Sequence, residues 1–220
     1  SRTDLTLPKG QMELVRAAKA TGRPVVLVLV NGQPLTVNAA ERRAAAILET
    51  WFPGCRGGVA VAKTLFGEIN PSGKLTVTFP KSVGQIEYNF PFKKGSHGEQ
   101  PKWIEDPNGF GHTRVEGPLY PFGHGLSYTE FAYSGIRVEA QGDCSNGCWL
   151  VSCNVANVGK RAGAEVVQLY VRDEYSSVVA YDSVLRGFEK VFLDPGESKR
   201  VAFALKPEDL AILDRDMKWA

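Results

Sequence analysis

Close pairs of carboxylates are the side chains whose types and spacing could do acid–base chemistry. Glu105 and Asp106 are adjacent, and Asp214 and Asp216 flank Arg215. Two facing carboxyl groups can divide the work of glycoside hydrolysis, one as an acid and the other as a base or nucleophile. Neighbours in sequence need not face each other in a fold, and solvated loop charges explain both pairs. We therefore assign neither pair a catalytic role.

Other catalytic and metal-binding signatures are weak in this sequence. Ser127 lies in GHGLSYT, which lacks the second glycine and the strand-to-helix context of a nucleophile elbow. GFGHTR at 109–114 lacks the third glycine of a dinucleotide-binding loop. The three histidines lack metal-ligand spacing; they are His97, His112 and His124. We expect neither a cofactor nor a metal.

The cysteines leave three alternatives open. Cys144 and Cys148 enclose Asn146-Gly147, and this spacing suits a small disulfide loop, a pair of free thiols, or half of a zinc site. No histidine lies near them in the sequence, which argues against zinc. Cys153 shares strand parity with Trp149 and is expected to be a buried thiol.

Composition and charge exclude several classes of partner. The formal net charge of +2 over 220 residues gives no argument for nucleic acid or for an anionic membrane surface. The longest apolar run, PVVLVLV at 24–30, is too short to span a bilayer. Because the chain starts at Ser1 rather than at methionine, we expect a processed or cut product.

The first half of the chain alternates helical and strand patterns, which indicates an α/β layer domain with a largely parallel sheet. RPVVLVLVNG at 23–32 is a continuous β-branched run that suits a strand covered on both faces. The other predicted elements are helices over 7–22 and 57–68, a helix passing into a short apolar run over 38–52, and a strand over 73–80.

The second half consists of short segments with period-two alternation and no long helix between them. This pattern predicts an antiparallel β-sandwich of the fibronectin type III or immunoglobulin kind. The predicted strands cover 131–142, 148–159, 164–173, 184–197 and 198–210, and Trp219 begins what looks like another. Such a sandwich has about seven strands, so we expect an incomplete domain.

The change of period falls near residue 125, within the irregular aromatic stretch EGPLYPFGHGLSYTEF at 116–131. Its prolines lack an N–H and its glycines disfavour a helix, yet its aromatic side chains call for burial. We interpret the stretch as a rigid domain junction. The predicted layout is an α/β domain over 1–92, a long loop and junction over 93–125, and a β-sandwich over 126–220.

Three long motifs follow one another over essentially the whole chain: SRTDLTLP with the later PVVLVLVNGQPL, FGEINPSGKLTVTFPKSVGQI, and GPLYPFGHGLSYTEF. Together they resemble glycoside hydrolase family 3, and within it the bacterial periplasmic β-glucosidases. In that family a (β/α)-barrel precedes an α/β sandwich domain and often a fibronectin type III-like domain. The resemblance implies that this chain supplies the later part of the second domain and most of the third.

The resemblance implies retaining hydrolysis by an exo-acting β-glucosidase, with an aspartate nucleophile and a glutamate acid/base. The nucleophile belongs to the barrel, and the glutamate is expected just upstream of Ser1. Neither position is present in this sequence, so we name no catalytic residue and expect the chain alone to be inactive. The alternatives are a β-xylosidase of the same family and a non-catalytic carbohydrate- or cell-wall-binding module.

Five residues are candidates for lying near the substrate: Arg2, Trp51, Trp103, His112 and Arg114. Arg2 continues from the expected acid/base loop, although an ordinary surface arginine fits as well. Trp51 follows a predicted strand, where α/β sheets present ligand-facing loops, but core burial is the commoner role of an aromatic side chain. The remaining three lie in the long stretch 93–115 and could rim a site or pack the loop.

The resemblance also implies partners and a compartment. The expected partners are the N-terminal barrel part of the same enzyme and a β-glucoside or oligosaccharide substrate, and a homodimer is left open. A periplasmic or secreted location is implied, and the cysteines permit it. A carbohydrate-binding sandwich would display a row of exposed aromatic side chains, whereas the alternation around Trp149 predicts a core position for that ring.

Overall fold

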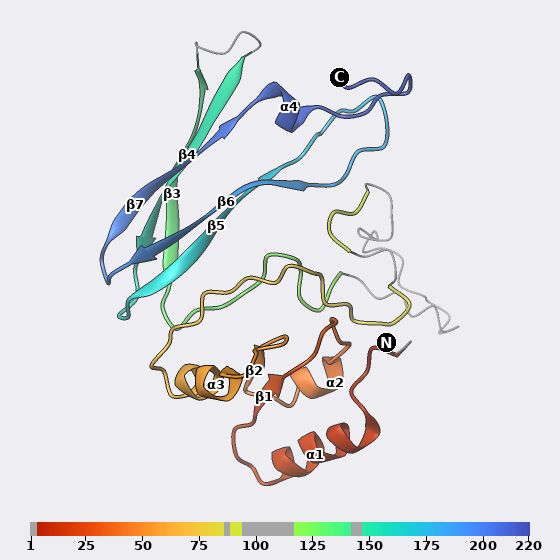
Figure 1. Cartoon of the computed structure of the whole chain (residues 1–220), viewed down its shortest axis with the longest axis vertical. Coiled ribbons are helices and arrows are strands. Elements are labelled where there is room, and N and C mark those ends of the chain that lie inside the picture. Colours follow the sequence, from red (N-terminus) through yellow and green to blue (C-terminus); the bar gives the residue numbers. More distant parts are fainter. Residues whose placement is uncertain (1–3, 86–88, 94–116, 142–146) are drawn as a thin grey trace, which may run out of the picture. The chain divides into compact units, whose positions relative to one another are not determined.

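The computed structural model describes residues 4–85, 89–93, 117–141 and 147–220, and Figure 1 shows its helices and strands. The chain forms two compact units, which we call the α/β unit and the sandwich unit. The α/β unit comprises Ser1–Ile69, Leu75–Phe90 and Gly95–His124, and the sandwich unit comprises Asn70–Lys74, Pro91–Lys94 and Gly125–Ala220. Two short segments from the first half of the sequence therefore belong to the sandwich unit.

The described part of the α/β unit contains, in order, α1 (Lys9–Ala20), β1 (Val26–Leu29), α2 (Asn38–Glu41), β2 (Ala46–Glu49) and α3 (Gly57–Leu65). β1 and β2 are parallel, and Leu29 lies opposite Glu49. The predicted α/β alternation is confirmed. The prediction of a strand over 23–32 covered on both faces is wrong, because β1 has four residues, Leu29 alone is buried, and Val26 is 47% exposed.

The core of the α/β unit draws one or two side chains from each of several segments. α1 contributes Val15, β1 contributes Leu29, and α2 contributes Ala40, while Phe79 is the largest fully buried side chain. α1 ends before Gly22, whose φ of 76° is the left-handed conformation that commonly closes a helix. The core thus fixes the positions of the loops that follow β1 and β2.

The predicted strand over 73–80 is replaced by an irregular pairing. The Leu75 N–H donates to the His124 carbonyl at 2.8 Å, and the Phe79 N–H donates to the Tyr120 carbonyl at 2.9 Å. Phe79 and Tyr120 form only an isolated bridge. A regular ladder is interrupted because Pro118 and Pro121 have no N–H to donate.

The sandwich unit has five strands in its described residues, as predicted: β3 (Phe131–Gln141), β4 (Cys148–Asn157), β5 (Gly163–Val171), β6 (Val184–Leu193) and β7 (Ser198–Leu205). They form a three-stranded sheet in the order β3-β4-β7 and a two-stranded sheet of β5 and β6, and all pairings are antiparallel. Val155, Val167, Val191, Leu193 and Val201 form the buried cluster of this unit. The predicted antiparallel β-sandwich is confirmed.

The end of the predicted strand 198–210 is wrong. β7 stops at Leu205, and residues Pro207–Leu210 form the short helix α4. Proline at the first helical position lacks the N–H that a ladder needs, and the Asp209 carboxylate accepts a hydrogen bond from the Lys206 N–H at 2.9 Å. Trp219, predicted to begin a further strand, forms an isolated antiparallel bridge with Leu213.

Candidate functional site

Trp51 is the one predicted substrate-proximal residue that the structure describes. Arg2, Trp103, His112 and Arg114 lie outside the described residues, as do Glu105 and Asp106. The other carboxylate pair has a local role, because Asp214 Oδ1 accepts hydrogen bonds from the Asp216 and Lys218 N–H groups at 2.9 Å each. Asp214 therefore organises a turn.

Three residues meet where β1 and β2 end. Glu49 Oε1 accepts a hydrogen bond from the Trp51 N–H at 2.8 Å, and Glu49 Oε2 accepts one from the Asn31 amide at 3.2 Å. The carboxyl ends of parallel strands are the edge at which α/β sheets commonly bind ligands. Glu49 thus joins the loop after β1 to the loop after β2, and we call Asn31, Glu49 and Trp51 the strand-end cluster.

Trp51 has an unusual backbone conformation within the strand-end cluster. Its φ is 50°, a left-handed value that is strained for a large residue and that tends to occur at functional positions. Its ring is half-buried and lies 5.9 Å from the Phe79 ring, against the core of the unit. Two roles were expected for Trp51, burial in the core and a position near the substrate. This packing favours burial in the core.

Phe52, the next residue, is the exposed aromatic side chain at this edge, with 79% of its surface exposed. Its ring lies so close to Gly32 that a Cβ added there would be 2.5 Å from it. Only glycine therefore leaves room for the ring in its present position. The sequence did not single out Phe52, because Trp51 and Phe52 are adjacent aromatic residues. Which of the two is exposed depends on the positive φ of Trp51.

The strand-end cluster holds a carboxyl group with altered acidity. Burial raises the pKa of Glu49 above its ordinary value of 4.5, and the hydrogen bonds from Trp51 and Asn31 only partly oppose this effect. Asn31 Oδ1 is buried without a hydrogen-bond partner among the described residues. The cluster can hold a proton and accept or donate hydrogen bonds. Its hydrogen bonds join two loops and involve no second carboxylate among the described residues.

Glu49→Gln is expected to stabilise the α/β unit increasingly as the pH rises from about 4 to about 7. The folded-state pKa of Glu49 is raised, so ionisation costs more in the folded state than in the unfolded state, and Gln removes that cost. The free energy of unfolding is measured in urea at both pH values. Hydrogen exchange of the backbone amides of 46–49 shows that the change belongs to the α/β unit. Exposed Glu13→Gln is the control, and a larger loss for Glu49→Gln at the higher pH would contradict the expectation.

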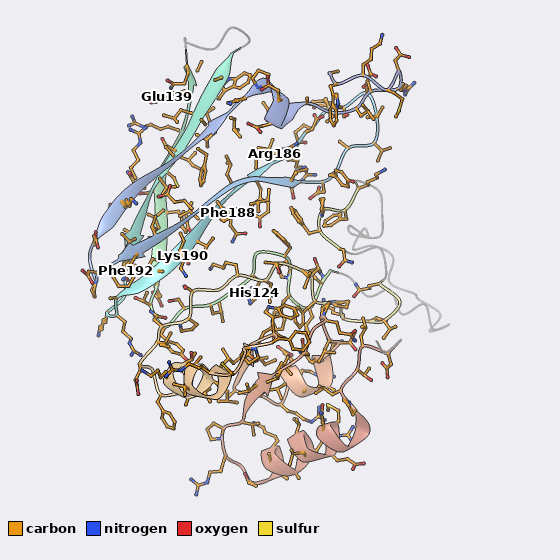
Figure 2. All side chains as sticks on the ribbon, viewed as in Figure 1. His124, Glu139, Arg186, Phe188, Lys190 and Phe192 are labelled. Atoms are coloured by element: carbon orange, nitrogen blue, oxygen red, sulfur yellow. The ribbon has the colours of Figure 1, made fainter. Side chains whose placement is uncertain are left out.

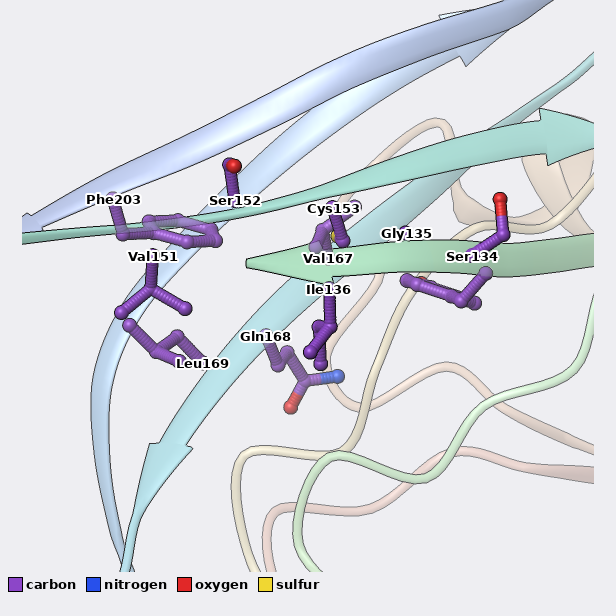
Figure 3. A pocket seen from close by; sticks show the side chains of 11 residues that line it. Ser134, Gly135, Ile136, Val151, Ser152, Cys153, Val167, Gln168, Leu169 and Phe203 are labelled. Atoms are coloured by element: carbon purple, nitrogen blue, oxygen red, sulfur yellow. The ribbon is translucent and has the colours of Figure 1, made fainter. Parts of the chain in front are cut away.

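A cavity of about 290 Å³ lies between the two sheets of the sandwich unit (Figure 3). Tyr133, Val151, Val167, Leu169 and Phe203 supply most of its apolar lining, and Cys153 contributes a thiol. None of the residues that line it carries a carboxyl group, so the cavity itself offers no acid/base pair for hydrolysis.

The structure gives the bonding state of three of the four cysteines. Cys148 is disulfide-bonded, whereas Cys55 and Cys153 are free. Cys144 lies outside the described residues, so its pairing with Cys148 stays a prediction. The Cys153 thiol is half-buried, and burial raises its pKa, which disfavours the reactive thiolate.

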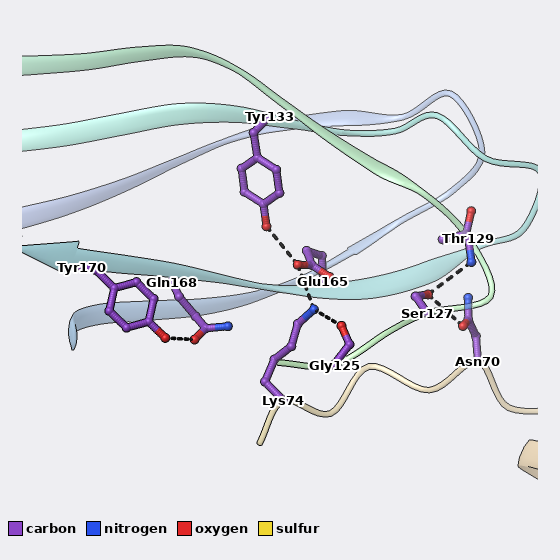
Figure 4. Close-up of polar contacts among 9 residues, drawn as sticks. All are labelled: Asn70, Lys74, Gly125, Ser127, Thr129, Tyr133, Glu165, Gln168 and Tyr170. Atoms are coloured by element: carbon purple, nitrogen blue, oxygen red, sulfur yellow. Dashed lines mark hydrogen bonds and ion pairs between the residues drawn. The ribbon is translucent and has the colours of Figure 1, made fainter. Parts of the chain in front are cut away.

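Two sequence motifs meet in a polar clasp within the sandwich unit (Figure 4). Asn70 Oδ1 accepts hydrogen bonds from Ser127 Oγ at 2.9 Å and from the Tyr128 N–H at 2.7 Å, and Asn70 Nδ2 donates to the Ala162 carbonyl at 3.0 Å. Lys74 Nζ lies 3.2 Å from Glu165 Oε1 and donates to the Gly125 carbonyl at 2.8 Å. NPSGK and GLSYT therefore fasten 70–74 and 125–129 to the start of β5.

Gly125 belongs to this clasp for a steric reason. A Cβ at this position would be 2.1 Å from the Gly73 carbonyl oxygen, which is backbone and cannot move aside cheaply. The close approach of the two backbones explains why a glycine separates His124 from Leu126 in the aromatic stretch.

Comparison with known proteins identifies the source of these motifs. The family profile described as Glycosyl hydrolase family 3 C-terminal domain matches residues 1–128, which is more than half of the chain. The chain belongs to glycoside hydrolase family 3. A second profile, described as Fibronectin type III-like domain, matches residues 165–220.

Relatives within family 3 align along nearly the whole chain. A β-xylosidase from Formosa agariphila is 45% identical over 99% of the chain, and a periplasmic β-glucosidase from Salmonella typhimurium is 44% identical over 100% of it. The solved structure of a β-glucosidase from Erythrobacter marinus is 40% identical, covers 100% of the chain and superposes with a TM-score of 0.87. A β-glucosidase from Listeria innocua in complex with isofagomine is 32% identical, covers 98% and has a TM-score of 0.86.

The chain spans about 29% of the length of the curated relatives it matches, and 28–30% of the two solved structures. The chain therefore corresponds to the C-terminal portion of family 3 proteins, as the resemblance predicted. In the described part of the chain, no helix has the length and apolar character needed to cross a membrane.

Proposed function

We propose that this chain is the C-terminal part of a retaining, exo-acting β-glucosidase that hydrolyses terminal β-D-glucosyl residues of oligosaccharides or glucosides. The observation that carries the proposal is the match of 98–100% of the chain to β-glucosidases. Retaining hydrolysis needs a nucleophile and an acid/base about 5 Å apart. In this proposal both come from upstream of Ser1, the nucleophile from the barrel.

The N-terminal part of the same enzyme is the proposed partner of the α/β unit. Parallel sheets are ordinarily buried on both faces, yet β1 and β2 form a pair with Val26 47% exposed. α3 is apolar but largely exposed, with Val59 51% exposed and Phe66 beside it 86% exposed. Apolar surface of this extent suits a partner that packs against it.

The chain alone is expected to release no chromophore from aryl β-glucosides, because it lacks both catalytic carboxyl groups. A fusion that puts residues 1–220 in place of the matching segment of the Salmonella typhimurium relative is expected to hydrolyse them. Purified fusion, purified chain and the unmodified relative are compared in one assay. A folded but inactive fusion beside an active relative, or turnover that tracks the purified chain, contradicts the proposal.

A β-xylosidase is the second candidate, favoured by the Formosa agariphila relative that is 45% identical to the chain. The fusion contains the barrel of a β-glucosidase, so it tests the contribution of this chain and not the sugar choice of its own parent. Aryl β-xylosides and aryl β-glucosides assayed with the parent enzyme decide between the two sugars. A periplasmic or secreted location belongs to the same proposal and is supported by the periplasmic relative.

A further inference from the structure

The outer face of the two-stranded sheet in the sandwich unit carries a row of alternating cationic and aromatic side chains. Arg186, Phe188, Lys190 and Phe192 are alternate residues of β6, and Figure 2 labels all four. Phe188 is 69% exposed and Phe192 is 64% exposed. We call these four residues the β6 row.

The direction of the β6 row follows from the pleat of the strand. Val191 and Leu193 are buried in the core, and a Cβ at Gly187 would meet the Phe203 ring, so the odd-numbered positions face inward. Successive side chains point to opposite faces, so Phe188, Lys190 and Phe192 face outward. The pairing with β5 shifts register between Leu185 and Gly187, so Arg186 lies at a bulge, where it is exposed. Across the sheet, Ala164 and Val166 lie opposite Phe192 and Lys190, and Gln168 lies opposite Phe188. The floor is thus apolar beside Phe192 and Lys190 and polar beside Phe188.

The opposite sheet has a different outer surface. Arg200 Nη2 donates to Ser152 Oγ at 2.9 Å and lies 3.8 Å from Glu139 Oε2, so the charge of Arg200 is partnered within the sheet. By contrast, Arg186 and Lys190 form no ion pair with any residue that the structure describes. An exposed apolar surface with unpaired cations indicates a partner that brings negative charge.

The spacing of the β6 row suits a linear polymer. Alternate residues of a strand are about 6.6 Å apart, so Phe188, Lys190 and Phe192 extend over about 13 Å, and Arg186 lies at the bulge next to them. The cations and flat rings of this row offer carboxylates an ion pair and sugar rings an apolar face to stack on. The carbohydrate chemistry of family 3 favours a glycan over a nucleic acid as the polymer.

We propose that the β6 row binds an extended anionic polysaccharide. This role is separate from hydrolysis and does not require the catalytic part of the enzyme. It differs from the predicted binding module in its site, because the aromatics are Phe188 and Phe192 rather than Trp149, which is half-buried in β4.

The test measures how far residues 1–220 are retarded in native gels that contain a soluble polymer. Isothermal titration calorimetry on the same samples measures the affinity. Carboxymethyl cellulose is the anionic probe and hydroxyethyl cellulose is the uncharged probe on the same backbone. At low salt, carboxymethyl cellulose is expected to retard the chain and hydroxyethyl cellulose is not. Phe188→Ala/Phe192→Ala and Arg186→Gln/Lys190→Gln are each expected to weaken binding by about tenfold, because two exposed contacts are lost in each.

The control Arg137→Gln/Arg200→Gln removes two cations from β3 and β7, and its binding is expected to stay within about twofold of the unchanged chain. Equal retardation by both celluloses overturns the proposal, as does unchanged binding after Phe188→Ala/Phe192→Ala. Tighter binding to oligo(dT) than to carboxymethyl cellulose also overturns it, in favour of nucleic acid. Dimerisation in sedimentation that Phe188→Ala/Phe192→Ala abolishes would mean that a second copy covers the row.

Discussion

Asn157→Ala is expected to lower the free energy of unfolding of the sandwich unit by about 3 kcal/mol or more. Asn157 is 1% exposed, and its side chain forms hydrogen bonds with four residues from three segments. Its Oδ1 accepts hydrogen bonds from Thr129 Oγ1 at 2.8 Å and from the Gly159 N–H at 3.1 Å. Its Nδ2 donates to the Arg161 carbonyl at 2.7 Å and to the Leu193 carbonyl at 3.0 Å. Alanine leaves several of these groups buried without partners.

Native-state hydrogen exchange of the peptide 148–157 measures this free energy for the sandwich unit separately from the α/β unit. Asn154→Ala is the matched control, because Asn154 is an exposed asparagine on the same strand, and its effect should stay within about 0.5 kcal/mol. Asn157→Asp should not rescue the loss, since a carboxylate would face two carbonyl oxygens. A loss no larger than that of the control, or full rescue by aspartate, would refute this account of Asn157.

Regular elements with a clear hydrophobic period were predictable from the sequence. The segment 148–159 alternates strongly and forms β4 over Cys148–Asn157, and 184–197 forms β6 over Val184–Leu193. The parallel pairing of β1 with β2 also agrees with the predicted, largely parallel sheet. In these features local pattern and tertiary packing agree.

Predictions were wrong where a distant segment decides the structure. The 73–80 stretch has the alternation of a strand, but the segment opposite it contains Pro118 and Pro121, and a ladder needs donors on both sides. The length of β1 depends on neighbours that a single-strand pattern does not reveal. The seven-residue apolar run therefore predicted a longer and better covered strand than the structure contains.

The functional features were harder to predict than the fold. Asn70 and Lys74 lie far from Glu165 in the sequence, and only the fold brings all three into one clasp. The β6 row could not be predicted, because both faces of LRGFEKVFL carry apolar residues. Alternation alone therefore does not show which face of the strand is buried. Gly187 resolves the choice, since its inward position against Phe203 leaves Phe188 and Phe192 outside.

Lys74→Met is expected to destabilise the sandwich unit by about 3 kcal/mol. The side chains of Lys74 and Glu165 are only 17% and 12% exposed, so solvent screens their ion pair weakly. Removing the ammonium group leaves the Glu165 carboxylate with the Tyr133 hydroxyl, which donates to it at 3.0 Å, and leaves the Gly125 carbonyl without this donor. Burial and the neighbouring Glu165 charge both raise the pKa of Tyr133, so its hydroxyl stays a proton donor rather than a second anion.

A double-mutant cycle distinguishes the lost ion pair from lost packing. Lys74→Met/Glu165→Gln should be less destabilised than Lys74→Met alone, because the uncompensated buried charge is then absent. Lys199→Met breaks an exposed pair with Glu189, whose side chain is 39% exposed, and should cost only about 0–0.5 kcal/mol. Additive effects in the cycle, measured by exchange of the β5 amides, would mean that the clasp holds by packing and not by charge.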